Sequence, residues 1–290
     1  MRHRVARSVV VGVVLAAVLC VWLVWTSSGS LIAAAPRRIA PAPPELGAQD
    51  VSFQSSSGTT VQGWLSRGVR GQGAILLLHG VRGSRLDMVS RALFLHRLGY
   101  SVLLIDFQAH GETPGRQITF GYLESRDVVA ALNYLKTEFP EEKFGVIGVS
   151  MGAAAFVLAD KRPRVDAAVL ESMYPTIEQA VRDRLSIYLG PFGPTLAPSL
   201  TAELAPRLGL RPADLRPIDH IQEIDCPLLV INGTADRHTR IDETRDIFQK
   251  AHKPKELWEV QGASHVNLHR FASAEYEQRI TEFFARYLSR

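Results

Sequence analysis

The chain has 290 residues, of which 46% are hydrophobic, enough for one large α/β domain with its own core. Its net charge of +4 comes from the first 40 residues, which hold five arginines and no acid; the remainder has 33 − 5 = 28 basic and 29 acidic residues, or −1. The pI of about 9.2 therefore gives no support to nucleic-acid binding, and the two cysteines, Cys20 and Cys226, exclude a disulfide framework and a cysteine-based metal site.

The first 35 residues have the pattern of a membrane segment. Three arginines precede an apolar run at residues 9–25, and no charge occurs between residues 8 and 35. As a helix, this stretch would extend about 42 Å, enough for a ~30 Å hydrocarbon layer. We interpret residues 1–35 as an uncleaved anchor with the following domain outside the cytoplasm. The alternative is a secreted protein with a cleaved signal peptide, because residues 33–35 are three alanines, although Pro36 follows them.

A linker and a hairpin come next. Four prolines in residues 36–48 predict an extended linker, and we expect residues 1–45 to lie outside the fold. The folded domain is then residues 49–290. It begins with two runs, 51–54 and 59–65, that predict a β-hairpin.

Strands and helices alternate through the rest of the chain. The apolar run 74–78 predicts a strand covered on both sheet faces. The further predicted elements are a helix at about 84–98, a strand at 100–105, a helix at 122–139, a strand ending at Val149, strands at 165–170, 227–231 and 257–260, and helices at about 241–251 and 274–288. This order predicts an α/β fold, a mostly parallel sheet with helices on both faces. In such sheets the functional site lies at the carboxyl ends of the strands.

One stretch interrupts the alternation. Residues 175–217 hold seven of the 16 prolines together with scattered leucines and aromatic residues. The stretch is too long for a plain loop and too apolar for a linker. It predicts a small helical insertion, or lid; the alternative is a surface decoration with no role.

The pattern Gly-x-Ser-x-Gly occurs at Gly148, Ser150 and Gly152. An apolar run precedes it and a run of small helix-forming residues follows, as in a strand, a sharp turn and a helix. Both glycines fit because side chains there would collide across so tight a turn. The turn would present Ser150 at the amino end of a helix, where positive charge stabilises an oxyanion.

A serine hydroxyl needs a histidine to take its proton and a carboxylate to orient that histidine. Asp236 comes just after the strand at 227–231, and His265 comes just after the strand at 257–260. Both therefore lie where the carboxyl ends of the strands converge. The chain order Ser150, Asp236, His265 is that of the α/β-hydrolase sheet.

Five motifs in register carry a family resemblance: "HGVRGS", "DFQAHGET", "GVSMG", "INGTADRHT" and "GASH". Over about residues 49–290 the chain resembles a serine α/β-hydrolase of the single-domain esterase and lipase-like branch. This resemblance implies the nucleophile at Ser150, the acid at Asp236 and the base at His265.

The resemblance also implies supporting residues. The backbone N–H groups of Val81 and Met151 match the oxyanion donors, and His79 and Asp106 match positions that brace the loops. Gly80, Gly148 and Gly152 complete this supporting set. The chain departs from the family pattern at Gln108 and Ala109, where Arg-Gly is frequent.

Other residues compete for these roles. The other histidines near predicted loops are His110, His220, His238 and His269. Among them His269 is the main alternative base, if its strand extends further than expected. Asp225 precedes a strand and so lies at the wrong end, and Asp242 opens a helix, where capping explains it.

The expected function is hydrolysis of carboxylic esters, on a small-molecule or lipid-like acyl substrate and without a cofactor. A metal site at His79, Asp106 and His110 is disfavoured because no metal-ligand spacing is repeated. The same residues would also serve an amide or thioester hydrolase or an acyltransferase. A non-catalytic, membrane-tethered binding module is a third alternative.

Overall fold

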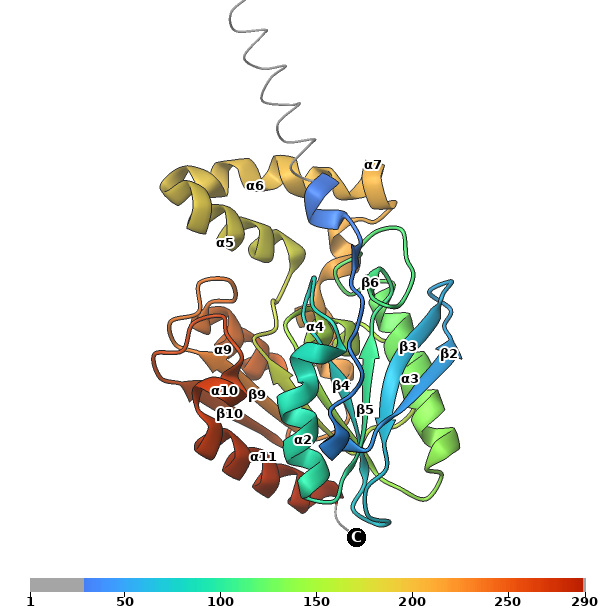
Figure 1. The fold of residues 1–290 in the computed structure, drawn as a ribbon. Helices are drawn as coiled ribbons and strands as arrows, with labels where there is room; N and C mark the ends of the chain where they lie inside the picture. Colours follow the sequence, from blue (N-terminus) through green and yellow to red (C-terminus); the bar gives the residue numbers. More distant parts are fainter. Residues whose placement is uncertain (1–28, 289–290) are drawn as a thin grey trace, which may run out of the picture.

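An eight-stranded sheet runs through the computed structural model, which describes residues 29–288 (Figure 1). Its strands are β2 (Gln49–Gln54), β3 (Thr60–Ser66), β4 (Ala74–Leu78), β5 (Ser101–Asp106), β7 (Phe144–Val149), β8 (Ala167–Glu171), β9 (Leu228–Gly233) and β10 (Lys255–Val260). Their order is β10-β9-β8-β7-β4-β5-β3-β2. Adjacent strands are parallel except for β2 with β3 and β3 with β5. The predicted mostly parallel sheet is confirmed.

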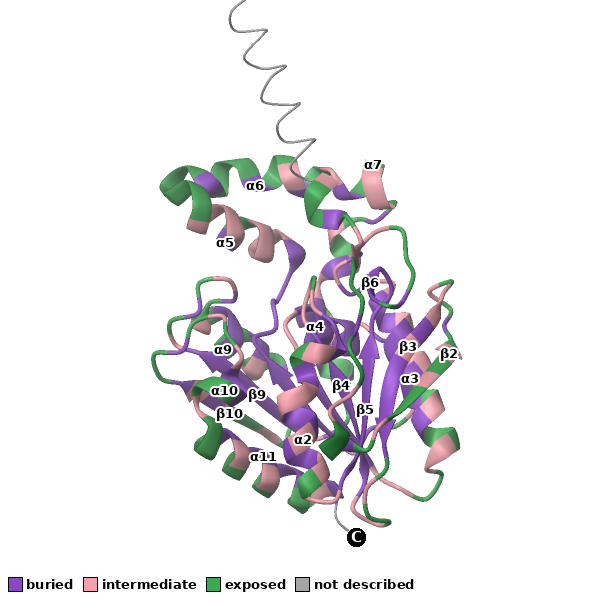
Figure 2. Ribbon diagram, viewed as in Figure 1, coloured by how far each residue is buried: buried purple, intermediate pink, exposed green. Residues whose placement is uncertain are grey.

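Burial explains the apolar runs of the central strands. Every residue of β4, β5, β8 and β9 is buried, whereas the edge strand β2 alternates between exposed and half-buried residues. Figure 2 shows the buried centre of the sheet between helices whose outer faces are exposed. Successive residues of β4 point to opposite faces: Ile75 and Leu77 join one core, Leu76 and Leu78 the other.

Helices cover both faces of the sheet, as predicted. The main ones are α2 (Val89–Arg97), α3 (Glu124–Glu138), α4 (Met151–Val157), α9 (Ile241–Lys250), the short α10 (Leu268–Phe271) and α11 (Ser273–Leu288). The first core holds side chains of α2 and α11, and the second holds side chains of α3, α4 and α9. Shorter 3-10 helices are η1 (Pro44–Leu46), η2 (Arg85–Met88), η3 (Gly190–Phe192), η4 (Pro212–Leu215) and η5 (Ile221–Glu223).

The predicted insertion is helical. It contains α5 (Ile177–Leu189), α6 (Gly193–Ala202) and α7 (Leu204–Leu208), followed by α8 (Pro217–His220). We call residues 177–208 the cap; Figure 1 shows its helices above the carboxyl ends of the strands. Thr176 begins α5 by accepting the N–H of Gln179 at 3.2 Å. The insertion has a small core of its own, made of Ile177, Leu204, Leu210 and Leu215.

The segment before the sheet packs against the domain, which differs from the expectation that residues 1–45 lie outside the fold. Ile32, Ile39 and Leu46 are buried. The short strand β1 (Ala35–Pro36) pairs with β6 (His110–Gly111). The prolines keep this segment extended, while the apolar residues between them bind it to the surface.

Residues 1–28 lie outside the described part of the chain, and with them the predicted membrane segment at residues 9–25. Within residues 29–288, no helix combines the length and the apolar character needed to span a bilayer.

Candidate active site

Ser150 occupies a strained turn between β7 and α4. Its φ of 51° and ψ of −113° lie in a region that side chains rarely adopt. The N–H of Ser150 donates to the carbonyl of Glu171 at 2.7 Å and so ties the turn to β8. Such strain persists only where the surroundings fix it, and it marks functional positions.

The two glycines of the turn are required because neighbouring backbone atoms leave no room for a side chain at either position. A Cβ at Gly148 would lie 2.7 Å from the Cα of Ala153, and a Cβ at Gly152 would lie 2.5 Å from the carbonyl oxygen of Leu78. These distances are shorter than any carbon side chain tolerates. The pattern around Ser150 therefore follows from how tightly α4 packs on β4 and β7.

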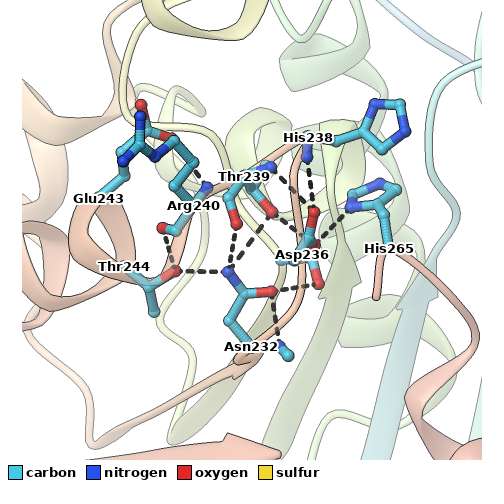
Figure 3. Close-up of polar contacts among 10 residues, drawn as sticks. Asn232, Asp236, His238, Thr239, Arg240, Glu243, Thr244 and His265 are labelled. Atoms are coloured by element: carbon cyan, nitrogen blue, oxygen red, sulfur yellow. Dashed lines mark hydrogen bonds and ion pairs between the residues drawn. The ribbon is translucent and has the colours of Figure 1, made fainter. Parts of the chain in front are cut away.

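His265 and Asp236 are in direct polar contact. The Nδ1 atom of His265 lies 2.7 Å from Oδ2 of Asp236 (Figure 3). The Oδ1 atom of Asp236 accepts the N–H groups of His238 at 2.8 Å and Thr239 at 3.0 Å, and the Thr239 hydroxyl donates to Oδ2 at 2.9 Å. Four contacts thus fix the carboxylate.

The electrostatics of Asp236 favour the ionised form. Burial alone would raise its pKa, but the hydrogen bond and charge of His265, together with the N–H groups of Thr239 and His238, outweigh burial and lower the pKa. An ionised carboxylate only accepts hydrogen bonds, so Nδ1 of His265 carries the proton that it donates. In the neutral ring, Nε2 is then free to accept one.

Ser150 and His265 line two cavities in common. One, the apolar cavity, measures about 190 Å³ and lies partly under the cap. Its apolar lining includes Phe120, Met151, Tyr174, Ile177, Val181 and Leu185. The other, the polar cavity, measures about 410 Å³. A larger depression of about 890 Å³ lies at the amino ends of β7, β8 and β9 and contains none of these site residues.

Val81 and Met151 border Ser150 from two sides. Met151 is the first residue of α4, so its N–H has no acceptor within the helix. A Cβ at Gly80 would lie 3.5 Å from the Cβ of Ser150, which places the loop after β4 directly against the serine. Val81 follows in this loop and lines both cavities.

His79 and Asp106 connect the loops at the rim of the sheet. His79 is buried; its Nδ1 pairs with the carbonyl of Gly80 at 2.7 Å, and its Nε2 accepts the N–H of Phe107 at 3.2 Å. Burial, followed by the charge of His110, lowers the pKa of His79 to about 3, so the ring is neutral. Asp106 accepts the N–H groups of Arg85 at 2.7 Å and Glu112 at 3.0 Å.

Gln108 and Ala109, where the chain departs from the family pattern, also brace a loop. The buried Gln108 amide donates to Oε1 of Glu124 at 2.7 Å and to the carbonyl of Gln117 at 2.9 Å. Ala109 has a φ of 60°, the region where glycine is more usual.

The alternative base, His269, and the alternative acids, Asp242 and Asp225, do not line the cavities at Ser150. His269 is buried against Phe94 and Tyr276, and its Nε2 lies 2.9 Å from Oε1 of Glu277. It lines neither cavity. Asp242 is exposed and pairs with Arg245 at 3.3 Å. Asp225 borders the depression at the opposite edge of the sheet.

The remaining histidines also differ in position. His238 lines the apolar cavity, with its ring centroid 5.0 Å from that of His265. His110 pairs with the carbonyl of Gln108 at 2.8 Å, and His220 pairs with Glu223 at 3.0 Å. Within residues 29–288, no three or more side chains of metal-binding type converge on one point.

A buried ion pair behind the polar cavity was not foreseen from the sequence. Glu171 accepts Nε of Arg91 at 2.9 Å, Nη2 of Arg91 at 2.5 Å and the hydroxyl of Tyr276 at 2.6 Å. Arg91 also donates to Oδ1 of Asn267 at 3.2 Å. The cluster links β8, α2, α11 and the loop after His265. No local pattern could reveal it, since Arg91 and Glu171 are 80 residues apart.

Comparison with known proteins finds relatives over most of the chain. A family model described as "Alpha/beta hydrolase family" matches residues 75–279. An uncharacterized protein of Mycobacterium tuberculosis is 30% identical over 223 residues, covering 75% of this chain and 72% of that protein. An uncharacterized protein of Bacillus subtilis is 25% identical over 214 residues, covering 72% and 70%.

Solved structures with a similar fold include esterases. One structure of a Pyrococcus furiosus esterase matches with a TM-score of 0.74 and 24% identity, covering 89% of this chain and 99% of that one. A second crystal form has a TM-score of 0.71 and 25% identity, covering 88% and 100%. An esterase from Rhodococcus sp. matches with a TM-score of 0.60 and 18% identity, covering 81% and 98%.

Proposed function

The chain belongs to the alpha/beta hydrolase family, and we propose that it is a serine hydrolase that cleaves carboxylic esters through an acyl-enzyme intermediate. The observation that carries the proposal is the 2.7 Å contact of Asp236 with His265, a histidine that lines the same cavities as the strained Ser150. The similarity to esterase structures favours esters among the acyl substrates.

In the proposed reaction, Nε2 of His265 accepts the hydroxyl proton of Ser150 as its Oγ attacks the acyl carbon. The N–H groups of Val81 and Met151 stabilise the oxyanion that forms. His265 then gives the proton to the departing alcohol, and a water activated by the same ring releases the acid. Asp236 holds the ring in the required tautomer and stabilises it when charged.

The apolar cavity would receive the acyl chain. Most of its lining residues are aliphatic or aromatic, and it adjoins Ser150 and Met151. An apolar cavity of ~150 Å³ holds a benzene-sized group, so the volume here corresponds to a chain of roughly six to eight carbons. A second, smaller apolar cavity lined by Leu31, Phe120 and Leu204 extends the same region.

The test is turnover of 4-nitrophenyl hexanoate together with labelling by a fluorophosphonate probe. Ser150→Ala should abolish both, because no nucleophile remains. Ser186→Ala is the matched control: this cap serine donates to the carbonyl of Arg182 and lines neither cavity. Undiminished turnover by Ser150→Ala would refute the proposal.

Ser150, Asp236 and His265 could also catalyse the hydrolysis of thioesters or amides, or acyl transfer. A panel of hexanoyl ester, thioester and anilide substrates, run with and without an added alcohol acceptor, distinguishes ester hydrolysis from thioester or amide hydrolysis and from acyl transfer. A non-catalytic binding module would react with neither substrate nor probe.

The membrane anchor is a separate proposal that rests on the sequence of residues 1–35 alone. The full-length chain should stay in the membrane fraction after an alkaline carbonate wash. Release into the soluble fraction would contradict an uncleaved anchor, and loss of the first 35 residues from the mature chain would favour the signal peptide.

A further inference from the structure

The two cavities that meet at Ser150 differ in polarity. The apolar cavity fits a hydrocarbon chain, whereas the polar cavity is lined by three arginines, Arg91, Arg184 and Arg270, and one acid, Asp87. Because Arg91 is paired with Glu171, the remaining charged lining of the polar cavity, Arg184, Arg270 and Asp87, sums to 2 − 1 = +1, although residues 41–290 carry a net charge of −1. Arg184 and Arg82 also border the apolar cavity, whereas Arg270 borders the polar cavity alone. Hydrolysis of an ester needs one space for the acyl part and one for the alcohol part, so this charge faces the alcohol.

Two of these arginines have no counter-ion. Arg91 is neutralised by Glu171, as described above. Arg184 and Arg270 form no ion pair with any residue of the described chain. Arg184 belongs to α5 of the cap and Arg270 to α10, which are separate elements in Figure 1. Both arginines, neither of which has an ion pair, line the polar cavity.

Arg184 lies close enough to the reacting groups for its charge to act on them. It is half-buried and lines both cavities. Its charge helps to lower the pKa of His238, after the larger effect of burial, and His238 lies beside His265. A bound anion would give this guanidinium the ionic partner that it lacks within the described residues.

The other charged groups nearby are already engaged. Oδ2 of Asp87 accepts the N–H of Ser84 at 3.2 Å and so caps η2. Arg82, which lines the apolar cavity, donates to the carbonyls of Ser30 at 3.1 Å and Ala33 at 3.3 Å. Among the charged side chains of the two cavities, Arg184 and Arg270 thus have neither an ion pair nor a side-chain hydrogen bond within residues 29–288.

We propose that the alcohol part of the ester carries an anionic group, a carboxylate or a phosphate, which Arg184 and Arg270 bind while the acyl chain occupies the apolar cavity. This inference rests on the proposed esterase function. The bond between the acyl carbon and the alcohol oxygen breaks; water supplies the hydroxyl to the acyl carbon and the proton to the alcohol. The products are a fatty acid and an anionic alcohol.

The experiment compares kcat/KM for matched hexanoyl esters, using the full-length chain. One pair is 4-(hexanoyloxy)benzoate and neutral 4-(hexanoyloxy)benzamide. The other is 1-hexanoylglycerol 3-phosphate and neutral 1-hexanoylglycerol. The anionic member of at least one pair should be preferred about tenfold or more, and the pair that shows the preference identifies carboxylate or phosphate as the group bound.

Arginine variants connect the preference to the cavity. Arg270→Gln and Arg184→Gln should each reduce the ratio of anionic to neutral kcat/KM about tenfold, and Arg270→Lys should retain part of it. Arg70→Gln is the matched control, because Arg70 is exposed in the loop before β4, at the opposite edge of the sheet. Its ratio should equal that of the unaltered chain.

The possible results distinguish a failure of this inference from a failure of the proposed esterase function. Hydrolysis of both pairs with no preference for the anion, or a preference that both arginine variants retain, overturns the inference alone. Failure to hydrolyse any of the four esters, or hydrolysis that survives Ser150→Ala, removes the proposed function and the inference with it.

Discussion

The carboxyl groups of Asp183 and Glu243 face each other where cap helix α5 meets the amino end of α9. Both side chains are buried, and Oδ2 of Asp183 and Oε1 of Glu243 have no hydrogen-bond partner in the described structure. Two ionised carboxylates in this position would repel each other, so the folded state favours the form in which one of them keeps its proton. Burial, followed by the charge of Asp183, raises the pKa of Glu243 to about 7, against the opposing charge of Arg182.

This pair makes stability depend on pH. The pKa of Glu243 is higher in the folded chain, at about 7, than its ordinary value of 4.5, which applies to the unfolded chain. The protonated group therefore stabilises the folded state fully below pH 4.5, and this contribution is lost as the pH rises through about 7. Glu243→Gln stays neutral and keeps an acceptor for the N–H of Arg240. We expect it to raise the melting temperature at pH 8 and to change it little at pH 4. Thermal denaturation across this range is the measurement; the exposed Glu282→Gln is the control, and an equal shift at both pH values would contradict the argument.

Asp236 should be indispensable for orienting His265. In Asp236→Asn the amide would donate to Nδ1 and favour the wrong tautomer, so kcat for 4-nitrophenyl hexanoate should fall by about 10⁴-fold with little change in the far-UV circular dichroism spectrum. Asp242→Asn, six residues further along and exposed, should keep its activity. Comparable losses in the two variants would exclude the assignment of Asp236.

His265 and His269 should behave differently. His265→Gln removes the only ring that both lines the cavities with Ser150 and contacts Asp236 in the described structure, and kcat should fall by roughly 10⁴-fold. His269→Gln should keep kcat but lower the melting temperature, because its ring packs in the core against Tyr276. Loss of kcat in the folded His269 variant would show that the base has been misassigned.

Filling the apolar cavity should shorten the preferred acyl chain. Ala180 of α5 lines this cavity, so Ala180→Phe should lower kcat/KM for octanoyl esters about tenfold more than for acetyl esters. Ala202→Phe introduces the same side chain on the exposed side of α6 and serves as control. An unchanged ratio in the Ala180 variant would mean that the acyl chain lies elsewhere.

Much of the fold could be read from local patterns. The strand predicted at 74–78 agrees with β4, and the predicted helix at 241–251 differs from α9 by one residue. In α11, Tyr276, Ile280 and Phe283 are buried as expected, but Tyr287 is only partly buried, whereas Phe284 and Leu288 are fully buried. A helical stripe repeats every 3.6 residues, so the sequence alone leaves its edge uncertain by one position.

The sequence by itself determined the alternation of strands and helices, the tight turn at Ser150, and the positions of Asp236 and His265 just beyond two strands. Burial periodicity and turn chemistry are local, so neighbouring residues are enough to encode them. Only the tertiary structure decided that Arg91 pairs with Glu171 and that Asp183 lies beside Glu243. It also decided that Leu46, in the proline-rich segment before the sheet, joins the core, and that Arg184 and Arg270 line the same cavity. Those contacts join residues far apart in the chain, and they depend on how whole elements pack, which no short stretch of sequence specifies.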